Sequence, residues 1–429
     1  MKHYKSFVGL ALLAMAALSG CKSEEERVIN MLPTTRSIEL TDVQREFVNK
    51  NNDFSFNFFR SLSENKLKGR SSVVSPLSAT FVLGMLNDGA AGHTAHEIAS
   101  VLGFGEGAAE DVNAFCKKLI EELPQVDPSV EVEIANLLIA NSGKDVRLAS
   151  QFRSDMEDSY HASVSANDFS NANFLGEING WCSDHTHGMI PEILSEKDLK
   201  PEFVVMLLNA IYYKATWTNK FDLNDTHKEN FTVPDGSVQK LPLMHRKAWA
   251  RYGQNDIYST LYLPYGTGDR WSMMLLLPNE GKTTADIISN LDNASWEKNL
   301  EEMWEPEVDI KIPRFTTQTD TDLKETISRI GAPSMFDPEK AEFPKMCDND
   351  FERVWVGLMK QKAIIEVNEE GTKASAVTVT AGVGESYVGH GDFIERPMKV
   401  DFHCNRPFVY LIREATSGTI FFIGTFQGN

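Results

Sequence analysis

Residues 367–380 place the tightest constraint on how this chain can fold. From Thr372 onward every second residue is small and uncharged, and the single charge, Lys373, lies in the other register. Because successive side chains of a strand point to opposite faces, this pattern predicts a segment that can enter a β-sheet with one face against a tightly packed interior. No proline, which would interrupt the hydrogen-bond ladder, occurs between Gly371 and Arg396.

The same segment continues into a glycine-rich stretch, residues 382–391, whose composition predicts an exposed loop. A strand that leaves a turn at the edge of a sheet would show the same period of two, and the pattern alone does not separate these interpretations. The sequence around the segment therefore has to decide between an ordinary edge strand and a strand-competent segment joined to a loop.

Residues 362–372, KAIIEVNEEGT, closely resemble the hinge that enters the reactive-centre loop of the serpins. Further segments similar to serpin motifs follow in the family's order over roughly 380 residues. They are SPLS at 75–78, LGMLNDGA at 83–90, INGW at 178–181, THGMI at 186–190, LNAIYYKATW at 208–217, LPY at 263–265, SMMLLLP at 272–278, IPRF at 312–315 and NRPFVYLI at 405–412. Each motif is weak alone, but their shared order identifies the chain as a member of the serpin family.

The resemblance implies an α+β serpin fold, with helices packed on a large central β-sheet, smaller sheets and an exposed reactive-centre loop at about residues 369–400. Local patterns agree with this class. Helical periodicity dominates residues 41–102, and β-rich runs separated by turns dominate the last third of the chain. No repeat or linker divides residues 41–429, which we expect to form a single serpin domain.

Two helices near the front can be placed by their termini. Ser75 is expected to cap a helix whose first residue is Pro76 and which stops at Asp88-Gly89. Thr94 and Glu97 have the spacing of a capping box, which predicts a second helix that begins there and ends near residues 102–103.

The N-terminus predicts export. Two lysines precede an apolar run, residues 7–18, that is too short for a permanent membrane span and is typical of a signal peptide, residues 1–20. The sequence LSGC at 18–21 resembles a bacterial lipobox, which implies a lipid-modified Cys21 and a tether over residues 21–40; a chance cleavage site before an ordinary cysteine is the alternative. Residues 22–26, KSEEE, resemble the acidic tag of surface-exported lipoproteins of the Bacteroidetes, although a plain solvated tether would look the same.

These features lead us to expect a lipid-anchored protein of the cell envelope, exposed on the outer-membrane surface. The sequence does not decide between the inner and the outer leaflet. Removing the signal peptide deletes two lysines and no acidic residue, so the formal charge of −19 becomes −21. This acidity argues against nucleic acid or anionic lipid headgroups as partners. It is also what keeps many secreted proteins soluble.

Four further cysteines, Cys116, Cys182, Cys347 and Cys404, are widely spaced and include no Cys-x-x-Cys pair. Their spacing indicates neither a zinc site nor a disulfide framework. We expect buried free thiols, with one disulfide left open as an alternative.

Enzyme motifs are incomplete. His96-Glu97 begins like the helix of a zinc protease but lacks the second histidine one turn later, and the pair His185 and His187 has no acidic partner at a recognisable spacing. No Gly-x-Ser-x-Gly elbow occurs. The sequence therefore predicts no catalysis, no metal and no cofactor.

The resemblance implies a suicide-substrate mechanism. A target serine protease attacks the loop and forms an acyl-enzyme, the cleaved loop inserts into the main sheet, and the attached protease is distorted before it can deacylate. Gly371 lets the hinge rearrange, and the inward-facing side chains of Thr372, Ala374, Ala376 and Thr378 are small enough to fit over the helices beneath the sheet. The hinge comprises Glu369, Glu370, Gly371, Thr372, Ala374, Ser375 and Ala376.

We accordingly predict an irreversible inhibitor, a monomer that forms a covalent complex with a serine protease. The sequence does not decide whether cysteine proteases are trapped as well. The alternative is a non-inhibitory serpin that acts as a surface binding or carrier module.

Other family positions map with one departure. Ser75, Ser78 and Asn179 match the shutter, where the sheet parts, and Trp217 matches the tryptophan at its upper opening, the breach. The histidine that is common just before Lys-Ala is Gln361 here. Glutamine both donates and accepts hydrogen bonds without titrating, which puts any histidine-linked pH sensitivity of opening in doubt.

Two counts place the reactive bond differently. Counting from the hinge by the family's spacing puts it between Glu385 and Ser386, whereas counting back from Asn405 puts it between Arg396 and Pro397, about eleven residues later. We prefer the hinge count, because insertion length is set from that side and an Arg-Pro bond is a poor substrate. Neighbouring bonds at Val383, Gly384 and Tyr387 remain alternatives; Glu385 would suit a Glu- or Asp-preferring protease, Val383 an elastase-like enzyme and Tyr387 a chymotrypsin-like one.

Overall fold

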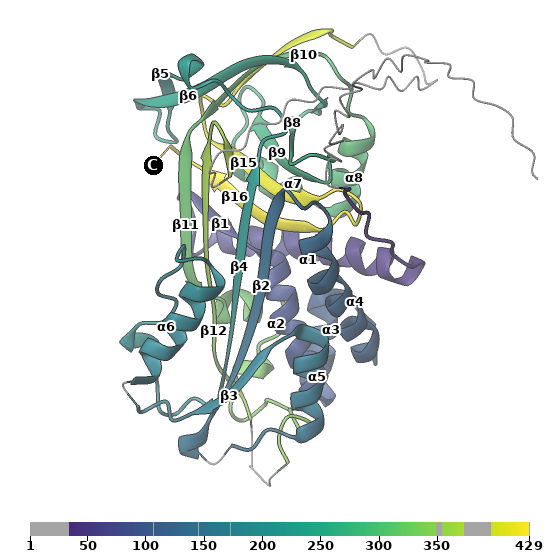
Figure 1. Cartoon of the computed structure of the whole chain (residues 1–429), viewed down its shortest axis with the longest axis vertical. Coiled ribbons are helices and arrows are strands. Elements are labelled where there is room, and N and C mark those ends of the chain that lie inside the picture. The colour runs from purple at the N-terminus through teal and green to yellow at the C-terminus, as the bar shows by residue number, and fades with distance from the viewer. Residues whose placement is uncertain are drawn as a thin grey trace, which may run out of the picture. The chain divides into compact units, whose positions relative to one another are not determined.

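The large sheet of the fold has six strands in the order β11-β12-β13-β4-β2-β3 (Figure 1). The computed structural model describes residues 34–105, 107–144, 146–171, 173–348, 354–372 and 396–428. The strands of this sheet are β2 (Val130–Asn141), β3 (Ser163–Asn167), β4 (Val205–Thr216), β11 (Phe315–Asp322), β12 (Val356–Asn368) and β13 (Gly371–Thr372).

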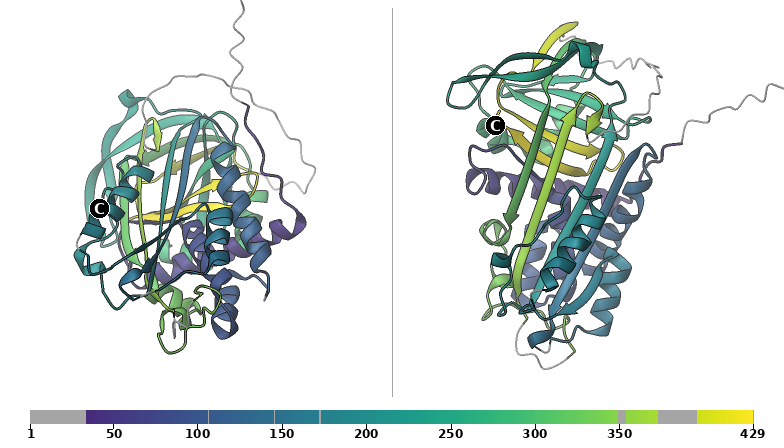
Figure 2. Two further views of the ribbon diagram at one scale, coloured as in Figure 1. Left: turned by 60° about the horizontal axis from the view of Figure 1, so that its bottom comes forward. Right: turned by 60° about the vertical axis from the view of Figure 1, so that its left-hand side comes forward.

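The two faces of this sheet belong to two different cores. On β4, Leu207 and Ile211 pack into the main core with helix α2, whereas Met206, Leu208 and Ala210 pack into a smaller core with helix α6. Because side chains alternate along a strand, the apolar run of β4 serves both faces at once. Figure 2 shows α6 on one side of the sheet and the bundle that contains α2 on the other.

Nine helices are found among the described residues. They are α1 (Asp42–Glu64), α2 (Pro76–Gly89), α3 (Gly92–Leu102), α4 (Ala109–Glu122), α5 (Ser150–Tyr160), α6 (Asn173–His185), α7 (Thr284–Asn290), α8 (Asn293–Glu301) and α9 (Lys324–Ile330). Among them, α2 is buried along almost its whole length. This helix lies beneath the large sheet, so its N-terminus is where the sheet and the helical core meet.

Two further sheets complete the fold. One has the order β1-β16-β15-β9-β8-β7, and every residue of β9, β15 and β16 is buried. The other has the order β14-β10-β6-β5. Their strands are β1 (Ser72–Val74), β5 (His227–Thr232), β6 (Val238–Trp249), β7 (Tyr252–Gln254), β8 (Tyr258–Tyr265), β9 (Trp271–Pro278), β10 (Glu307–Pro313), β14 (Lys399–His403), β15 (Phe408–Glu414) and β16 (Ile420–Phe426).

The helix termini test two sequence predictions. The first is confirmed: α2 begins at Pro76, and the hydroxyl of its N-cap Ser75 accepts the Ser78 N–H. The predicted capping box at Thr94 and Glu97 is wrong, since α3 already begins at Gly92. Both side chains make tertiary contacts instead: Thr94 Oγ1 bonds Ser334 Oγ, and Glu97 accepts the Ser334 N–H.

The cysteines agree with the expectation of free thiols. Cys116, Cys182, Cys347 and Cys404 are all unpaired, and only Cys347 is partly exposed. Burial raises the pKa of the Cys116 and Cys182 thiols to about 12, which keeps them protonated and unreactive.

No helix within the described ranges is long and apolar enough to cross a membrane. The predicted signal peptide, Cys21 and most of the tether lie outside the described residues.

Candidate functional site

The chain turns back at the end of β12 and re-enters the large sheet. After Asn368 it passes through Glu369 and Glu370, and Gly371–Thr372 then form β13. β13 pairs antiparallel with β12 on one side and with β4 on the other. The segment that the sequence predicts to enter a sheet therefore has its first two residues in the ladder.

β12 and β4 pair directly with each other only in the lower part of the sheet. Their parallel ladder begins at Val356 and ends at Gln361 of β12. Residues 362–366 of β12 and 210–214 of β4, all within the described ranges, do not pair with each other, although both stretches are strand. Because β13 fills only the upper end of this interval, further residues of the same strand would have a place in the sheet.

Gly371 is required where β13 begins. Its φ of 147° lies in a region that other residues rarely adopt. A Cβ at this position would overlap the Ala215 carbonyl oxygen and would lie 2.7 Å from the Thr216 Cα. Only glycine therefore allows the hinge to lie this close to β4.

Thr372 is 1% exposed and is held by a buried aromatic pair. Its hydroxyl and the Tyr265 hydroxyl are hydrogen-bonded at 2.6 Å, and the Tyr265 ring stacks on Trp217 at 4.3 Å between centroids. Burial raises the pKa of Tyr265, so its hydroxyl stays neutral. Trp217 in turn donates its indole N–H to the Asn368 carbonyl at 2.8 Å, which ties the turn to β4.

The turn itself is anchored by charge. Arg314, just before β11, donates to both carboxylate oxygens of Glu369, with Nη2–Oε1 2.5 Å and Nε–Oε2 3.2 Å, and Thr226 donates a third hydrogen bond at 2.7 Å. Lys220 pairs with the neighbouring Glu370. Burial would raise the pKa of Glu369, but the bonds from Arg314 and Thr226 outweigh it and hold the pKa below its ordinary value.

Acid should therefore weaken this anchor. Because the folded-state pKa of Glu369 is lowered, its contribution to stability is complete above the ordinary value of 4.5 and is lost as the pH falls through the lowered value. We expect Glu369→Gln to destabilise the protein by about 1–3 kcal/mol at neutral pH. The difference in unfolding temperature between the wild type and E369Q, followed by circular dichroism from pH 7 to pH 3, should shrink in acid.

Glu46→Gln, which removes an exposed carboxylate on α1, is the matched control and should leave the profile unchanged. A difference between E369Q and the wild type that stays constant down to pH 3 would contradict the assigned role of the Glu369–Arg314 pair.

Gln361 of β12 clamps the start of α2. Its amide donates to the Ser75 carbonyl at 2.8 Å and accepts the Ser75 N–H at 3.0 Å. The Ser75 hydroxyl donates to the Phe421 carbonyl at 2.8 Å. The large sheet, helix α2 and strand β16 thus meet at a buried network without a titratable side chain, at the lower limit of the unpaired interval.

A strand that re-enters its own sheet beside an unpaired interval is the geometry that the sequence motifs predict. A family model described as Serpin (serine protease inhibitor) matches residues 49–427. This chain belongs to the serpin family. Among curated relatives it is 29% identical to mouse antithrombin-III over 386 residues, covering 88% of this chain and 81% of the relative. It is 30% identical to human glia-derived nexin over 360 residues, covering 82% and 86%.

Solved structures agree with the serpin fold. The native state of Tengpin, a thermophilic serpin, is 26% identical, with a TM-score of 0.79 over 93% of this chain and 98% of that one. Human thyroxine-binding globulin, complexed with its ligand, is 24% identical with a TM-score of 0.78 over 89% and 98%. The α+β serpin fold with one large and two smaller sheets is thereby confirmed.

The serpin shutter residues from the sequence analysis occupy two places. Ser75, Ser78 and Gln361 form the network beneath the sheet. Asn179 lies on α6, where its side-chain Oδ1 accepts the N–H groups of Ile193 and Leu194 at 2.9 Å each. It therefore fixes the segment after α6 on the opposite face. Trp217 lies at the upper opening, beside β13.

Sequence reasoning missed a second buried polar pair in the shutter. Asn209 of β4 lies opposite Gln361 in the ladder and donates to Asn136 of β2 at 2.7 Å, and Asn136 donates to the Tyr160 carbonyl at 2.8 Å. Both asparagines interrupt apolar runs, and such an interruption is the signal that could have marked them. Together they link β4 to β2 and β2 to the end of α5.

The loop residues proper lie outside the described residues. These are the predicted bond Glu385–Ser386, its alternatives Val383, Gly384 and Tyr387, and the hinge residues Ala374, Ser375 and Ala376. Their assignment stays a prediction.

His185 at the end of α6 and His187 just after it share an acidic partner that their spacing in the sequence did not indicate. Glu133 of β2 contacts His185 Nδ1 through Oε1 at 2.6 Å and His187 Nε2 through Oε2 at 3.2 Å. The sequence spacing could not reveal this acidic neighbour, because β2 brings it from more than fifty residues away. The two nitrogens reach different oxygens, so they do not converge on one point.

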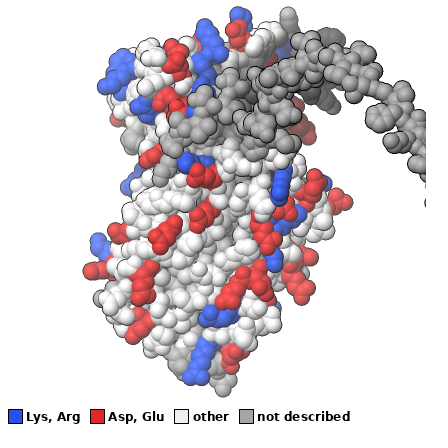
Figure 3. Space-filling model, in the orientation of Figure 1, with Lys and Arg blue, Asp and Glu red and all other residues white. Residues whose placement is uncertain are grey.

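Charge is unevenly spread over the face in Figure 3. Several lysines and arginines gather at the top, where the four-stranded sheet lies in Figure 1, whereas most charged side chains lower down are Asp and Glu. Despite the acidic excess of the sequence, basic and acidic side chains are therefore mixed at the end of the molecule that contains the four-stranded sheet (Figure 3). The strand β14, which follows the predicted loop, belongs to this sheet.

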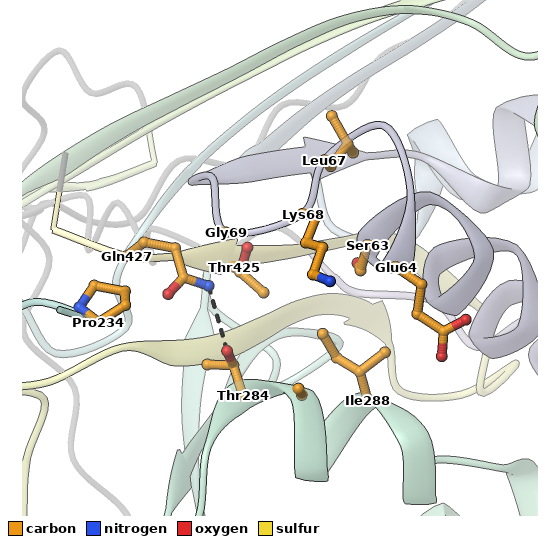
Figure 4. Close-up of a pocket in the computed structure, with 11 residues that line it drawn as sticks. Ser63, Glu64, Leu67, Lys68, Gly69, Pro234, Thr284, Ile288, Thr425 and Gln427 are labelled. Carbon is orange, nitrogen blue, oxygen red and sulfur yellow. Dashed lines mark hydrogen bonds between the residues drawn. The ribbon is translucent and has the colours of Figure 1, made fainter.

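A cavity of about 430 Å³ lies between the end of α1, helix α7 and the end of β16 (Figure 4). Its wall includes the apolar side chains of Leu67 and Ile288, on opposite sides, and the charged side chains of Glu64 and Lys68. Across it, the Gln427 side-chain amide donates to Thr284 Oγ1 at 3.3 Å. A cavity that combines apolar side chains with polar and charged ones, here including Glu64 and Lys68, can take a small organic ligand.

Proposed function

We propose that this serpin is an irreversible inhibitor of serine proteases and is not itself an enzyme. The position of β13 carries the proposal. The first two residues after the turn pair with β12 and β4, and an interval between these strands is open to more of the same strand. The residues that would follow alternate small side chains without proline, so they are suited to occupy that interval.

The chemistry belongs to the target protease. Its serine Oγ attacks the carbonyl of the reactive bond, between Glu385 and Ser386 by the hinge count, and the new amino terminus leaves as an acyl-enzyme ester forms. The arm that begins at Gly371 then extends β13 down the sheet and carries the ester-linked protease with it. Deacylation is prevented because the protease is displaced, so this chain needs no catalytic residue.

The relatives support this class of partner, since the matching family is one of serine protease inhibitors. Cysteine proteases would form a thioester with the same bond and are a second class to test.

We further propose that Cys21 carries the lipid that anchors the protein to the outer membrane at the cell surface. Cys21→Ser should release at least about 90% of the protein from the membrane fraction, because one or more acyl chains supply the attachment; retention of C21S in membranes would contradict the proposal.

A carrier function is the second candidate, and the 430 Å³ cavity favours it. Its wall combines apolar side chains with the Thr284 and Gln427 polar pair. This interpretation requires neither loop cleavage nor insertion.

Incubation with a panel of serine and cysteine proteases, followed by denaturing electrophoresis, separates the two. An inhibitor forms a band at the summed mass of protease and serpin that survives boiling in detergent. A panel that includes Glu-preferring, elastase-like and chymotrypsin-like enzymes and yields only cleaved chain would refute inhibition. Mass spectrometry of the released C-terminal fragment identifies the bond that is used.

A further inference from the structure

A convergence of histidine and aspartate side chains lies on the four-stranded sheet, away from the hinge. Asp309 is on the inner strand β10, with Lys247 of β6 and Asp401 of β14 directly opposite it on either side. Two residues further along β10, Lys311 has His245 of β6 on one side and His403 of β14 on the other. Because directly opposed residues share a face, these side chains all lie on one side of the sheet.

Both imidazoles reach the same carboxylate oxygen. His245 Nε2 lies 3.0 Å and His403 Nε2 lies 3.2 Å from Asp309 Oδ1. Two ligands bound tetrahedrally at 2.0–2.1 Å to one zinc ion are about 3.3 Å apart. The separations of the two imidazole nitrogens from Asp309 Oδ1 are therefore close to those between neighbouring ligands of a zinc ion.

Asp401 of β14 lies near Asp309 and His403, and His245 approaches the same cluster from β6 through Asp309. Ligand atoms of Asp309, Asp401 and His403 lie within 4.8 Å of one another. The Lys247 ammonium lies 3.1 Å from Asp309 Oδ2, the oxygen that the histidines do not use. Lys247 can therefore orient the carboxylate from behind while Oδ1 faces the ion, as supporting contacts do in metal sites.

The cluster is accessible from solvent: Asp401 is exposed, and the other three side chains are partly buried. The side chains of His245, His403 and Asp309 are 32%, 31% and 22% exposed. An ion can reach these groups from solvent, and the flanking strands hold them in register.

We propose that His245, Asp309, Asp401 and His403 form a binding site for a divalent transition metal of the zinc type. Imidazole combined with carboxylate favours zinc over calcium or magnesium, which prefer oxygen ligands. The pair His185 and His187 is less suited, because its nitrogens reach opposite oxygens of Glu133.

The site would fasten an edge strand. In the described structure β14 pairs with β10 alone, and it follows the predicted reactive loop in the sequence. A metal that joins His403 and Asp401 to Asp309 and His245 would link β14 to β10 and β6. Metal binding therefore becomes a means of holding the C-terminal arm of the loop on the sheet, a role that stands whether or not the protein inhibits proteases.

Zinc binding to the full-length chain tests the proposal. After equilibration with micromolar zinc and removal of free ion, elemental mass spectrometry should find one zinc per chain. The double variant H245Q/H403Q retains side-chain amide donors for Asp309 but lacks both imidazoles, and its affinity should fall at least about 100-fold. Zinc at about 100 times its dissociation constant should raise the unfolding temperature of the wild type by about 3 °C, reversibly with a chelator.

Two matched variants complete the experiment. H227Q changes an exposed histidine on β5 of the same sheet, and H185Q/H187Q removes the other histidine pair; both should bind zinc like the wild type. The proposal is overturned if the wild type retains no zinc, or if H245Q/H403Q binds as tightly as the wild type. Loss of binding in H185Q/H187Q with retention in H245Q/H403Q would move the site to Glu133. None of these readouts depends on a protease.

Discussion

Under the proposed function, replacing Thr372 with arginine should convert a protease inhibitor into a protease substrate. Thr372 is 1% exposed between β12 and β4, and its hydroxyl bonds Tyr265. A guanidinium at this position would have to be buried without an acidic partner, which costs several kcal/mol. The arm would therefore stay out of the sheet for longer than the protease needs to deacylate, and we expect the ratio of covalent complex to cleaved chain to fall at least about 100-fold.

Thr316→Arg is the matched control for this experiment. Thr316 lies on β11 of the same sheet with its side chain exposed, so the same change adds the same charge without burying it. T316R should form complex like the wild type. Densitometry of the complex and cleaved bands over a range of protease to serpin ratios measures the partition. A T372R variant that traps protease as well as the wild type does would rule out β13 as the start of the inserting strand.

The second large effect is thermal. Cleavage of the loop by any protease that cuts near residue 385 should raise the unfolding temperature by on the order of 10 °C or more. An extended β13 would pair with residues 362–366 of β12 and 210–214 of β4, which do not pair with each other in this structure. Each added hydrogen bond of the ladder contributes about 1 kcal/mol to the free energy of unfolding. For a chain of this length, the unfolding entropy converts each kcal/mol into a rise of roughly 1 °C in the unfolding temperature.

Scanning calorimetry of intact and cleaved protein measures this shift. Cleaved T372R is the internal control, since it should gain little stability if its arm does not enter the sheet. An unchanged unfolding temperature in the cleaved wild type would favour the carrier function. In that case attention would move to the cavity between α1, α7 and β16.

The sequence predicted the parts of the hinge that depend on local pattern. The alternation from Thr372 and the need for Gly371 can both be recognised without a structure, and the structure places both residues between two strands. The partners could not be predicted. Arg314 lies fifty-five residues before Glu369, and only the return of the chain along β11 brings the two together.

Tertiary contacts also explain the clear error. Thr94 and Glu97 have the spacing of a capping box, but their side chains bond the segment at Ser334, and the helix begins two residues earlier. The two histidines that contact Asp309 are likewise a tertiary arrangement that sequence spacing cannot predict. His245 and His403 are more than 150 residues apart and meet because β6 and β14 flank the same strand.

The two residues of β13 also bear on the speed of insertion. A new strand is slow to start, because its first residues must be ordered before any ladder bond repays the cost. In this protein Gly371 and Thr372 are already paired on both sides. Growth of the strand would therefore begin past the nucleation step, and its rate would depend on how fast each following residue is ordered between residues 362–366 and 210–214.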